Sequence, residues 1–193
     1  MPLSLAERRV LTRRYERLLD VATERSRPAI DAAWDRLTGY RDEDVAGFVL
    51  DTLPTINGLR SHARSIAVGC YSAVLQIPPP PVNVAAIDTA FYAESPFITV
   101  RAALADGHTL TEAAEMGRTK GHLQVKAFTN TTARATGDEF ANQANVRITG
   151  WLRSANPGAC EWCQRLDGAV FPDADSGNFG HTTCKCFLEP IAE

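Results

Sequence analysis

The stretch Val146-Arg-Ile-Thr-Gly-Trp-Leu-Arg153 marks the point at which the 193-residue chain changes character. Its residues alternate and are rich in β-formers, which predicts a strand. A second short strand is predicted at Ala169-Val-Phe171, after an Asp167-Gly168 turn signal. Upstream, apolar residues recur with helical spacing; downstream, cysteines stand among turn-forming residues. The sequence therefore predicts a mainly α fold, with a helical body over residues 1–145 and a small β-and-loop module over residues 146–193.

The helical body is divided by caps and helix breakers. Ser4 and Glu7 form a capping box at the start of a helix predicted to reach Leu37, and Pro28 is expected to break or kink this segment into two helices. A later helix carries Cys70 on its apolar side, which indicates a buried small hydrophobe rather than a metal ligand. Further helices are predicted from 42 or 44 to 53, from Pro54 to 76, from Ser95 to 105, from Thr109 or Thr111 to 137, and over 138–145.

Four consecutive prolines, Pro78 to Pro81, interrupt the helical pattern. Such a run forms stiff polyproline II structure. We expect a rigid connector inside the helical body, and a docking strip for a partner is the alternative.

Composition and charge bound the class of protein. The chain is 45% hydrophobic and 22% charged, with a formal charge of −3, which is typical of a globular protein without a general attraction to nucleic acid or acidic membranes. No signal-peptide pattern and no apolar run of about 20 residues is present. We therefore expect a soluble protein made in the cytoplasm, with no membrane partner. For the arginines of the first helix we expect a solvated face with partial salt bridging, and contact with phosphates is the alternative. There are seven of them: Arg8, Arg9, Arg13, Arg14, Arg17, Arg25 and Arg27.

The chemistry of the chain is concentrated in Cys160-Glu-Trp-Cys163 and His181-Thr-Thr-Cys184-Lys-Cys186. A C-x-x-C pair and an H-x-x-C pair each offer two ligands to one tetrahedral ion, and together they give the closed Cys₃His or Cys₄ set of structural zinc. Cys160 and Cys163 are the first two expected ligands. His181, Cys184 and Cys186 compete for the other two positions, and His181 with either Cys184 or Cys186 is favoured. The module contains few large apolar side chains, so we expect it to need a bound metal in order to fold. It is therefore predicted to be a zinc knuckle.

The sequence disfavours two other roles for these cysteines. A redox-active disulfide between Cys160 and Cys163 would lack the βαβ context of thioredoxin-like motifs. Catalytic zinc of the deaminase type needs an H-x-E sequence, which is absent here. No motif places a general base beside a serine or cysteine nucleophile. We therefore expect no catalytic residues, no enzymatic activity and no small-molecule substrate.

The order of motifs in this region resembles the C-terminal signature of phage minor head proteins, the head-morphogenesis proteins similar to the F protein of phage Mu and their relatives in actinobacterial phages. The matching motifs are Gly150-Trp-Leu-Arg153, Cys160-x-x-Cys163, Leu166-Asp-Gly168, Val170-Phe171, His181-x-x-Cys184-x-Cys186 and Pro190. Lys185 stands where the family commonly has Arg or His. The N-terminal body matches the family only in being helical and in its length.

This resemblance implies a low-copy protein of the virion head or procapsid, near the portal vertex, that acts in capsid assembly or DNA packaging. Its partners would be the portal protein, the major capsid protein, or both, with a weak DNA contact as a further option. The alternative is a zinc-containing nucleic-acid-binding protein that aids DNA packaging or delivery. Residues 160–193 contain two basic and six acidic residues, and an acidic segment repels phosphate, which disfavours this alternative.

Overall fold

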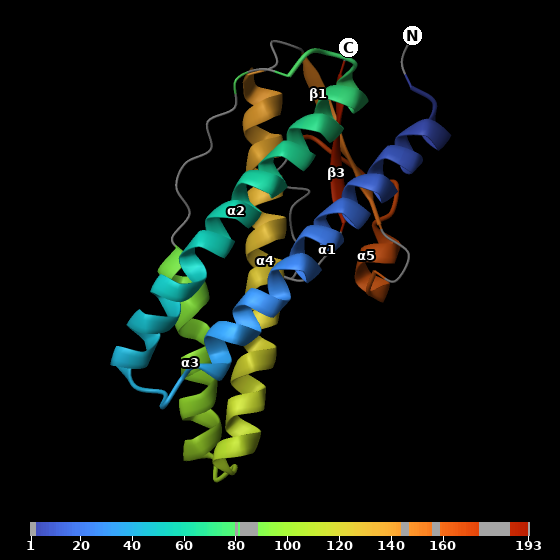
Figure 1. Ribbon diagram of the computed structural model, residues 1–193. Coiled ribbons are helices and arrows are strands. Elements are labelled where there is room, and N and C mark those ends of the chain that lie inside the picture. Colours follow the sequence, from blue (N-terminus) through green and yellow to red (C-terminus); the bar gives the residue numbers. More distant parts are fainter. Residues whose placement is uncertain are drawn as a thin grey trace. The chain divides into compact units, whose positions relative to one another are not determined.

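The computed structural model describes residues 3–79, 81, 89–143, 147–155, 159–173 and 186–192. The predicted fold class is confirmed in its coarse form, mainly α with a small antiparallel sheet in the C-terminal part, whereas the zinc knuckle stays a prediction. Within these ranges no helix combines the length and the apolar character needed to cross a membrane. The elements are α1 Leu5–Asp35, α2 Asp42–Leu75, α3 Thr89–Ala105, α4 Leu110–Gln143, β1 Ile148–Ser154, α5 Glu161–Arg165, β2 Val170–Phe171 and β3 Phe187–Ala192 (Figure 1).

The helix boundaries predicted at Pro28 and Pro54 are wrong, because both prolines lie inside continuous helices, α1 and α2. A proline inside a helix removes one hydrogen bond and costs about 3 kcal/mol. The buried face continues past each proline, to Ile30 in α1 and to Ile56 in α2. Packing along the whole face therefore outweighs the local cost of the proline.

Helices α3 and α4 are longer than predicted. α3 begins at Thr89 rather than at Ser95, with Pro96 inside it. α4 joins the helix predicted to end at Gly137 to the short helix predicted after it. Pro80 lies outside the described residues, so the rigid connector from Pro78 to Pro81 stays a prediction.

Capping boxes set the starts of two helices. The predicted box at Ser4 is confirmed, because the Ser4 amide and hydroxyl donate to the Glu7 carboxylate over 2.8 and 2.6 Å. Thr109 makes the same pair of bonds to Glu112 over 2.9 and 2.8 Å at the start of α4. These hydrogen bonds lower the pKa of both carboxyl groups.

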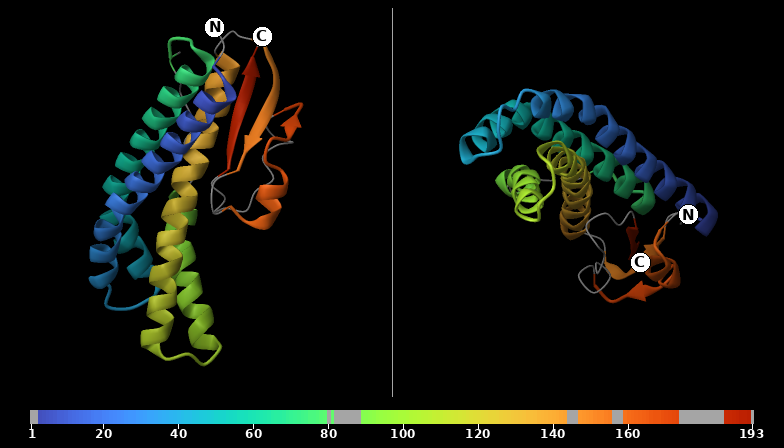
Figure 2. Two further views of the ribbon diagram at one scale, coloured as in Figure 1. Left: turned by 90° about the vertical axis from the view of Figure 1, so that its right-hand side faces the viewer. Right: turned by 90° about the horizontal axis from the view of Figure 1, so that it is seen from below.

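The sheet has the spatial order β2-β1-β3, and both pairings are antiparallel (Figure 2). β1 and β2 correspond to the two predicted strands, whereas β3 was not predicted. In the register of β3 on β1, Phe187 lies opposite Ser154 and Pro190 opposite Trp151. A proline is tolerated there because β3 is an edge strand that does not need every amide as a donor.

Contacts divide the chain into two compact units. Unit 1 comprises Met1–Asp20, Ala63–Ala85 and Asn130–Glu193, and unit 2 comprises Val21–His62 and Ala86–Thr129. These units are defined by contacts between residues, whereas the predicted division was based on residue pattern along the sequence. The predicted division into residues 1–145 and 146–193 therefore stays a prediction about parts that fold independently.

The core of unit 1 joins strands to helices. The Phe187 ring of β3 lies 4.8 Å from the Tyr15 ring and 5.2 Å from the Tyr71 ring, measured between ring centroids. The Tyr71 hydroxyl also donates to the Leu188 carbonyl over 3.0 Å, and Trp151 of β1 is buried in the same cluster. β3 is therefore attached to α1 and α2 directly after Cys186.

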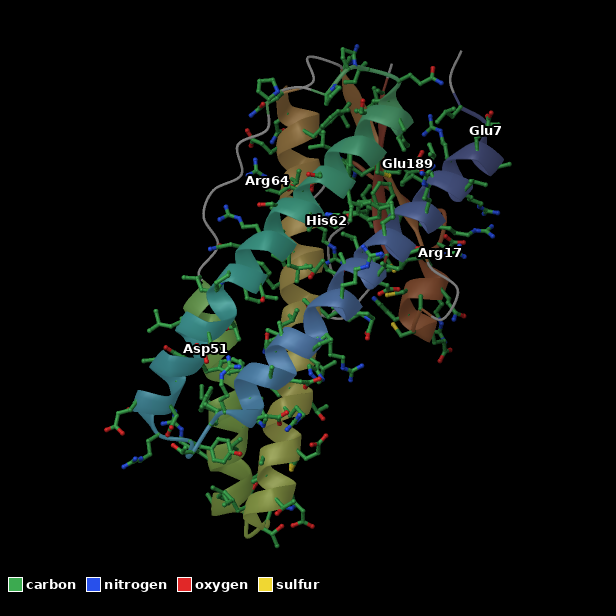
Figure 3. The ribbon with its side chains drawn as sticks, viewed as in Figure 1. Glu7, Arg17, Asp51, His62, Arg64 and Glu189 are labelled. Atoms are coloured by element: carbon green, nitrogen blue, oxygen red, sulfur yellow. The ribbon has the colours of Figure 1, made fainter. Side chains whose placement is uncertain are left out.

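An ion pair adds a second attachment of β3 to α1. The Arg8 guanidinium donates to the carboxylate of Glu189, which is only 1% exposed. Figure 3 labels Glu189. Burial raises the pKa of Glu189, and the charge of Arg8 opposes that rise in part. Removal of Arg8 would leave the buried Glu189 carboxylate without its compensating charge.

Unit 2 has an aromatic core of its own. The rings of Trp34, Phe48 and Phe97 lie 5.5 to 5.7 Å apart by centroid, and all three side chains are buried. Gly117 of α4 fits against this cluster, because a Cβ there would lie 2.8 Å from the Trp34 ring. The aromatic cluster thus fixes the N-terminal part of α2 against α3.

Candidate metal centre

The C-x-x-C motif forms the start of a short helix. Cys160 is the N-cap residue of α5, and its carbonyl accepts a 3.0 Å hydrogen bond from the Gln164 amide. Side chains three residues apart are neighbours on a helix surface. Cys163 is 1% exposed, whereas Cys160 is exposed at the helix start. The two thiols therefore differ in access to solvent.

The Leu166-Asp-Gly168 motif is the turn that returns the chain from α5 to the sheet. Gly168 has a φ of +80°, a conformation that favours glycine. Its amide donates to the Arg153 carbonyl over 2.8 Å, and the Asp167 carboxylate accepts from the Ala155 amide over 2.8 Å. This turn holds α5 beside the end of β1, which explains the residue types of the motif.

The structure brings together two cysteines from the two halves of the predicted ligand pattern. Cys163 of α5 and Cys186, which directly precedes β3, pack in one small buried cluster. Ala155 and Ala159 complete this cluster, and their small side chains leave the sulfurs as its largest groups. Two cysteines far apart in the sequence are therefore neighbours in the fold.

Arg153 of β1 is a site residue that the sequence analysis missed. Its side chain is 2% exposed, and its Nη2 donates to the Cys163 sulfur over 3.6 Å. A guanidinium beside a thiol favours the negatively charged sulfur, which is the form that binds a metal. Its burial could have been predicted from its position two residues after Trp151, because residues two apart lie on the same face of a strand.

Cys70 lies elsewhere in unit 1, in the core. Its prediction as a buried hydrophobe is confirmed, because it is 8% exposed in the same cluster as Tyr71. Burial, and to a smaller extent the Glu189 and Glu16 carboxylates, raises the pKa of Cys70 to about 12. No disulfide joins the cysteines of the described ranges, which are Cys70, Cys160, Cys163 and Cys186.

His181 and Cys184 lie outside the described residues, so the choice among His181, Cys184 and Cys186 stays open. In the described part of the chain, no three His, Cys, Asp or Glu side chains converge as metal ligands would. What is described fits a thiolate-bound metal in its donor chemistry. Two buried thiols are packed together, and a guanidinium next to one of them can balance thiolate charge.

Compared with protein-family models, with curated proteins and with solved structures, the chain gives no match. The resemblance to phage minor head proteins therefore stays a prediction from the C-terminal motifs.

A second candidate surface is the outer face of α1. Partial salt bridging is found along this helix, since Arg8 pairs with the buried Glu189 and Arg27 pairs with Glu24 on the surface. Among the described residues no ion pair engages the remaining arginines of α1, which are Arg9, Arg13, Arg14, Arg17 and Arg25. Their uncompensated charge makes this face basic in a chain whose formal charge is −3.

Proposed function

We propose that this chain is a phage minor head protein that acts in head morphogenesis near the portal, with a C-terminal structural zinc site that stabilises a surface for protein contacts. The observation that carries the zinc site is the packing of Cys163 against Cys186 beside Arg153. The order of motifs from 150 to 190 supports the role in the phage head.

The ligands proposed for zinc are Cys160, Cys163 and two of the three residues His181, Cys184 and Cys186. A closed set of four ligands makes zinc structural, and metal binding in small modules supplies on the order of 10 kcal/mol of folding free energy. α5 and its turn position the first thiols, and the attachment of β3 to the helices positions Cys186. Partners would be the portal protein, the major capsid protein, or both.

Elemental analysis of the purified protein tests the zinc site. We expect about one zinc per chain, because the pattern supplies one tetrahedral ligand set. Cys160→Ser and Cys163→Ser should each abolish binding, and Cys70→Ala should retain it as the matched control. Cys184→Ser and Cys186→Ser should differ in severity if only one of them is a ligand. If elemental analysis found no metal in protein prepared under reducing conditions, the proposal would be contradicted.

Mass spectrometry of purified procapsids and virions tests the role in the head. Trp151 and Phe187 belong to the core of unit 1, so deletion of the C-terminal module would disturb the helices as well. The double variant Cys160→Ser, Cys163→Ser is therefore sharper, with Cys70→Ala as control. We expect heads that lack the double variant or assemble poorly. Absence of the wild-type protein from both particles, despite abundance in infected cells, would refute the assignment.

DNA binding is a second candidate function, favoured by the arginines of α1 that have no ion-pair partner among the described residues. If they contact phosphates, affinity for duplex DNA should fall steeply with salt concentration. The zinc module would take no part, because Glu161, Asp167 and Asp173 give its exposed surface an acidic character.

A further inference from the structure

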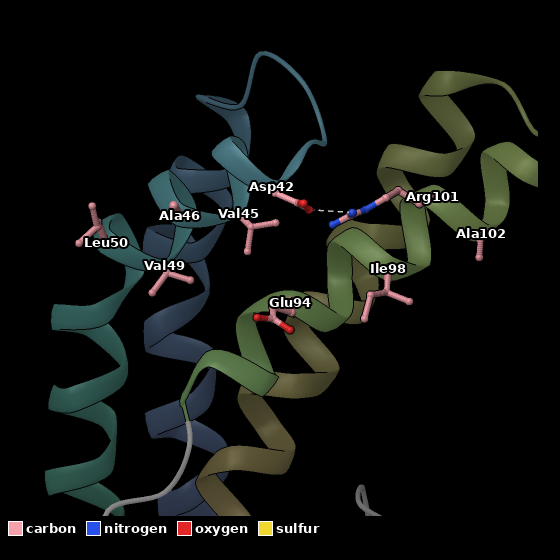
Figure 4. A pocket seen from close by; sticks show the side chains of 9 residues that line it. All are labelled: Asp42, Val45, Ala46, Val49, Leu50, Glu94, Ile98, Arg101 and Ala102. Carbon is pink, nitrogen blue, oxygen red and sulfur yellow. Dashed lines mark hydrogen bonds and ion pairs between the residues drawn. The ribbon is translucent and has the colours of Figure 1, made fainter.

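Unit 2 contains an open groove between the N-terminal part of α2 and the middle of α3 (Figure 4). Its volume is about 1,080 Å³, and its apolar walls include Leu50 of α2 and Ile98 of α3. These two side chains are 70% and 60% exposed, which is high for large aliphatic residues. Exposed apolar surface gathered in a groove marks a site of association.

The groove is almost neutral. The cluster of Trp34, Phe48 and Phe97 holds its two helices, and a 2.9 Å ion pair joins Asp42 to Arg101 across it. Since Asp42 and Arg101 compensate each other, the charge that remains among the lining residues is the exposed carboxylate of Glu94. A complementary partner therefore carries apolar side chains flanked by positive charge.

The size of the groove corresponds to two turns of a helix. From Asp42 to Leu50 the α2 wall is about 12 Å long, at about 1.5 Å per residue. A helix about 10 Å wide and about 12 Å long occupies about 900 Å³. The groove is large enough for such a segment.

The first half of α1, in unit 1, has the matching properties. Val10 and Leu18 are 64% and 41% exposed, and they stand about 12 Å apart along the helix. Arg13, Arg14 and Arg17 lie between them without ion-pair partners in the described part of the chain, and Figure 3 shows the position of Arg17. This face is apolar at both ends and basic between them.

We propose that the groove of one molecule binds the Val10–Leu18 face of α1 of a second copy of this chain. Val10 and Leu18 contact the apolar walls, and an arginine of the same face pairs with Glu94. Because the two surfaces differ, the association is head-to-tail and continues into rings or short filaments. Exposed aliphatic residues among the arginines favour this partner over nucleic acid, since phosphate contacts do not use aliphatic side chains.

Sedimentation equilibrium with two complementary variants tests the proposal. Arg13→Glu with Arg17→Glu disables the α1 face, and Leu50→Glu with Ile98→Glu disables the groove. All four side chains are exposed or on the solvent side of helices, so folding is retained. The wild type should show a mass that rises with concentration above 21.0 kDa, and each variant should stay at 21.0 kDa.

An equimolar mixture of the two variants should form a species of twice the monomer mass and nothing larger, because each molecule retains one working surface. Matched controls are Leu110→Glu with Met116→Glu, and Arg147→Glu with Arg165→Glu, which should associate as the wild type does. A wild type that stays monomeric, or a mixture without dimer, overturns the proposal. So does an arginine variant that associates normally but loses binding to duplex DNA, since the face would then serve nucleic acid.

Discussion

Gly137→Ala is expected to loosen the attachment of the sheet to the helices. An added Cβ at position 137 would lie 2.3 Å from the Tyr71 ring and 2.4 Å from its hydroxyl oxygen. Tyr71 is 2% exposed and packs on Phe140 and Phe187 at centroid distances of 6.0 and 5.2 Å, so its ring has no space to withdraw. The ring must shift, and its hydrogen bond to Leu188 is strained or lost.

The expected loss of stability follows from three contributions. Overpacking of a core costs about 1–3 kcal/mol, and loss of the Tyr71 hydrogen bond costs about 1 kcal/mol. Replacement of glycine by alanine inside a helix returns about 1 kcal/mol. The free energy of unfolding should therefore fall by about 1–3 kcal/mol.

Urea unfolding followed by circular dichroism measures this change, with Gly69→Ala as the matched control. Gly69 is an exposed residue of α2, and a Cβ there would meet nothing within 4 Å. Gly69→Ala should raise the free energy of unfolding by up to about 1 kcal/mol. If Gly137→Ala were as stable as Gly69→Ala, the close packing of Tyr71 on α4 would be wrong.

Three further predictions concern charge and thiol chemistry. Arg153→Met should weaken zinc binding by about 10–100-fold in a chelator competition, because the Cys163 thiolate loses its positive neighbour; an unchanged affinity would contradict that role. Cys70 should resist thiol reagents at neutral pH until the protein unfolds, because burial raises its pKa to about 12; peptide mass spectrometry showing Cys70 modified as fast as exposed Cys160 would disprove this. Glu189→Gln should remove one pH-dependent contribution to stability. Since the pKa of Glu189 is raised above its ordinary value of 4.5, this contribution is fully present below pH 4.5 and is lost as pH rises through the folded pKa. The free energy of unfolding of the variant minus that of the wild type should therefore increase with pH in that window, and a constant difference would refute the assignment.

The sequence predicted the class of fold because helical periodicity and capping are local properties. The capping box at Ser4 and the strand before Arg153 were found from neighbours in the chain alone. Pro28 was misread because its cost is local, whereas the compensation comes from burial along the whole face of α1. β3 was missed since its short run, interrupted by Pro190, becomes a strand only by pairing with β1.

Prediction of the candidate site had a similar limit. The spacing of the cysteines predicted Cys163 as a ligand and Cys186 as one of three candidates for the remaining positions, because spacing along the chain is a local property. Their packing with Ala155, and the approach of Arg153, depend on how β1 and α5 meet. A charged side chain on the buried side of a strand indicates a partner but does not identify it.

The composition of unit 1 has a consequence for the order of folding during synthesis. Unit 2 contains residues 21–62 and 86–129, so its contacts can form once residue 129 has emerged from the ribosome. Unit 1 must wait for Phe187, because the ring that packs on Tyr15 and Tyr71 is made last. Until then the first half of α1 has an incomplete core, and the nascent chain exposes apolar surface. The residue before Phe187 is Cys186, so the proposed metal ligands and this core residue would become available to the folding chain at the same moment.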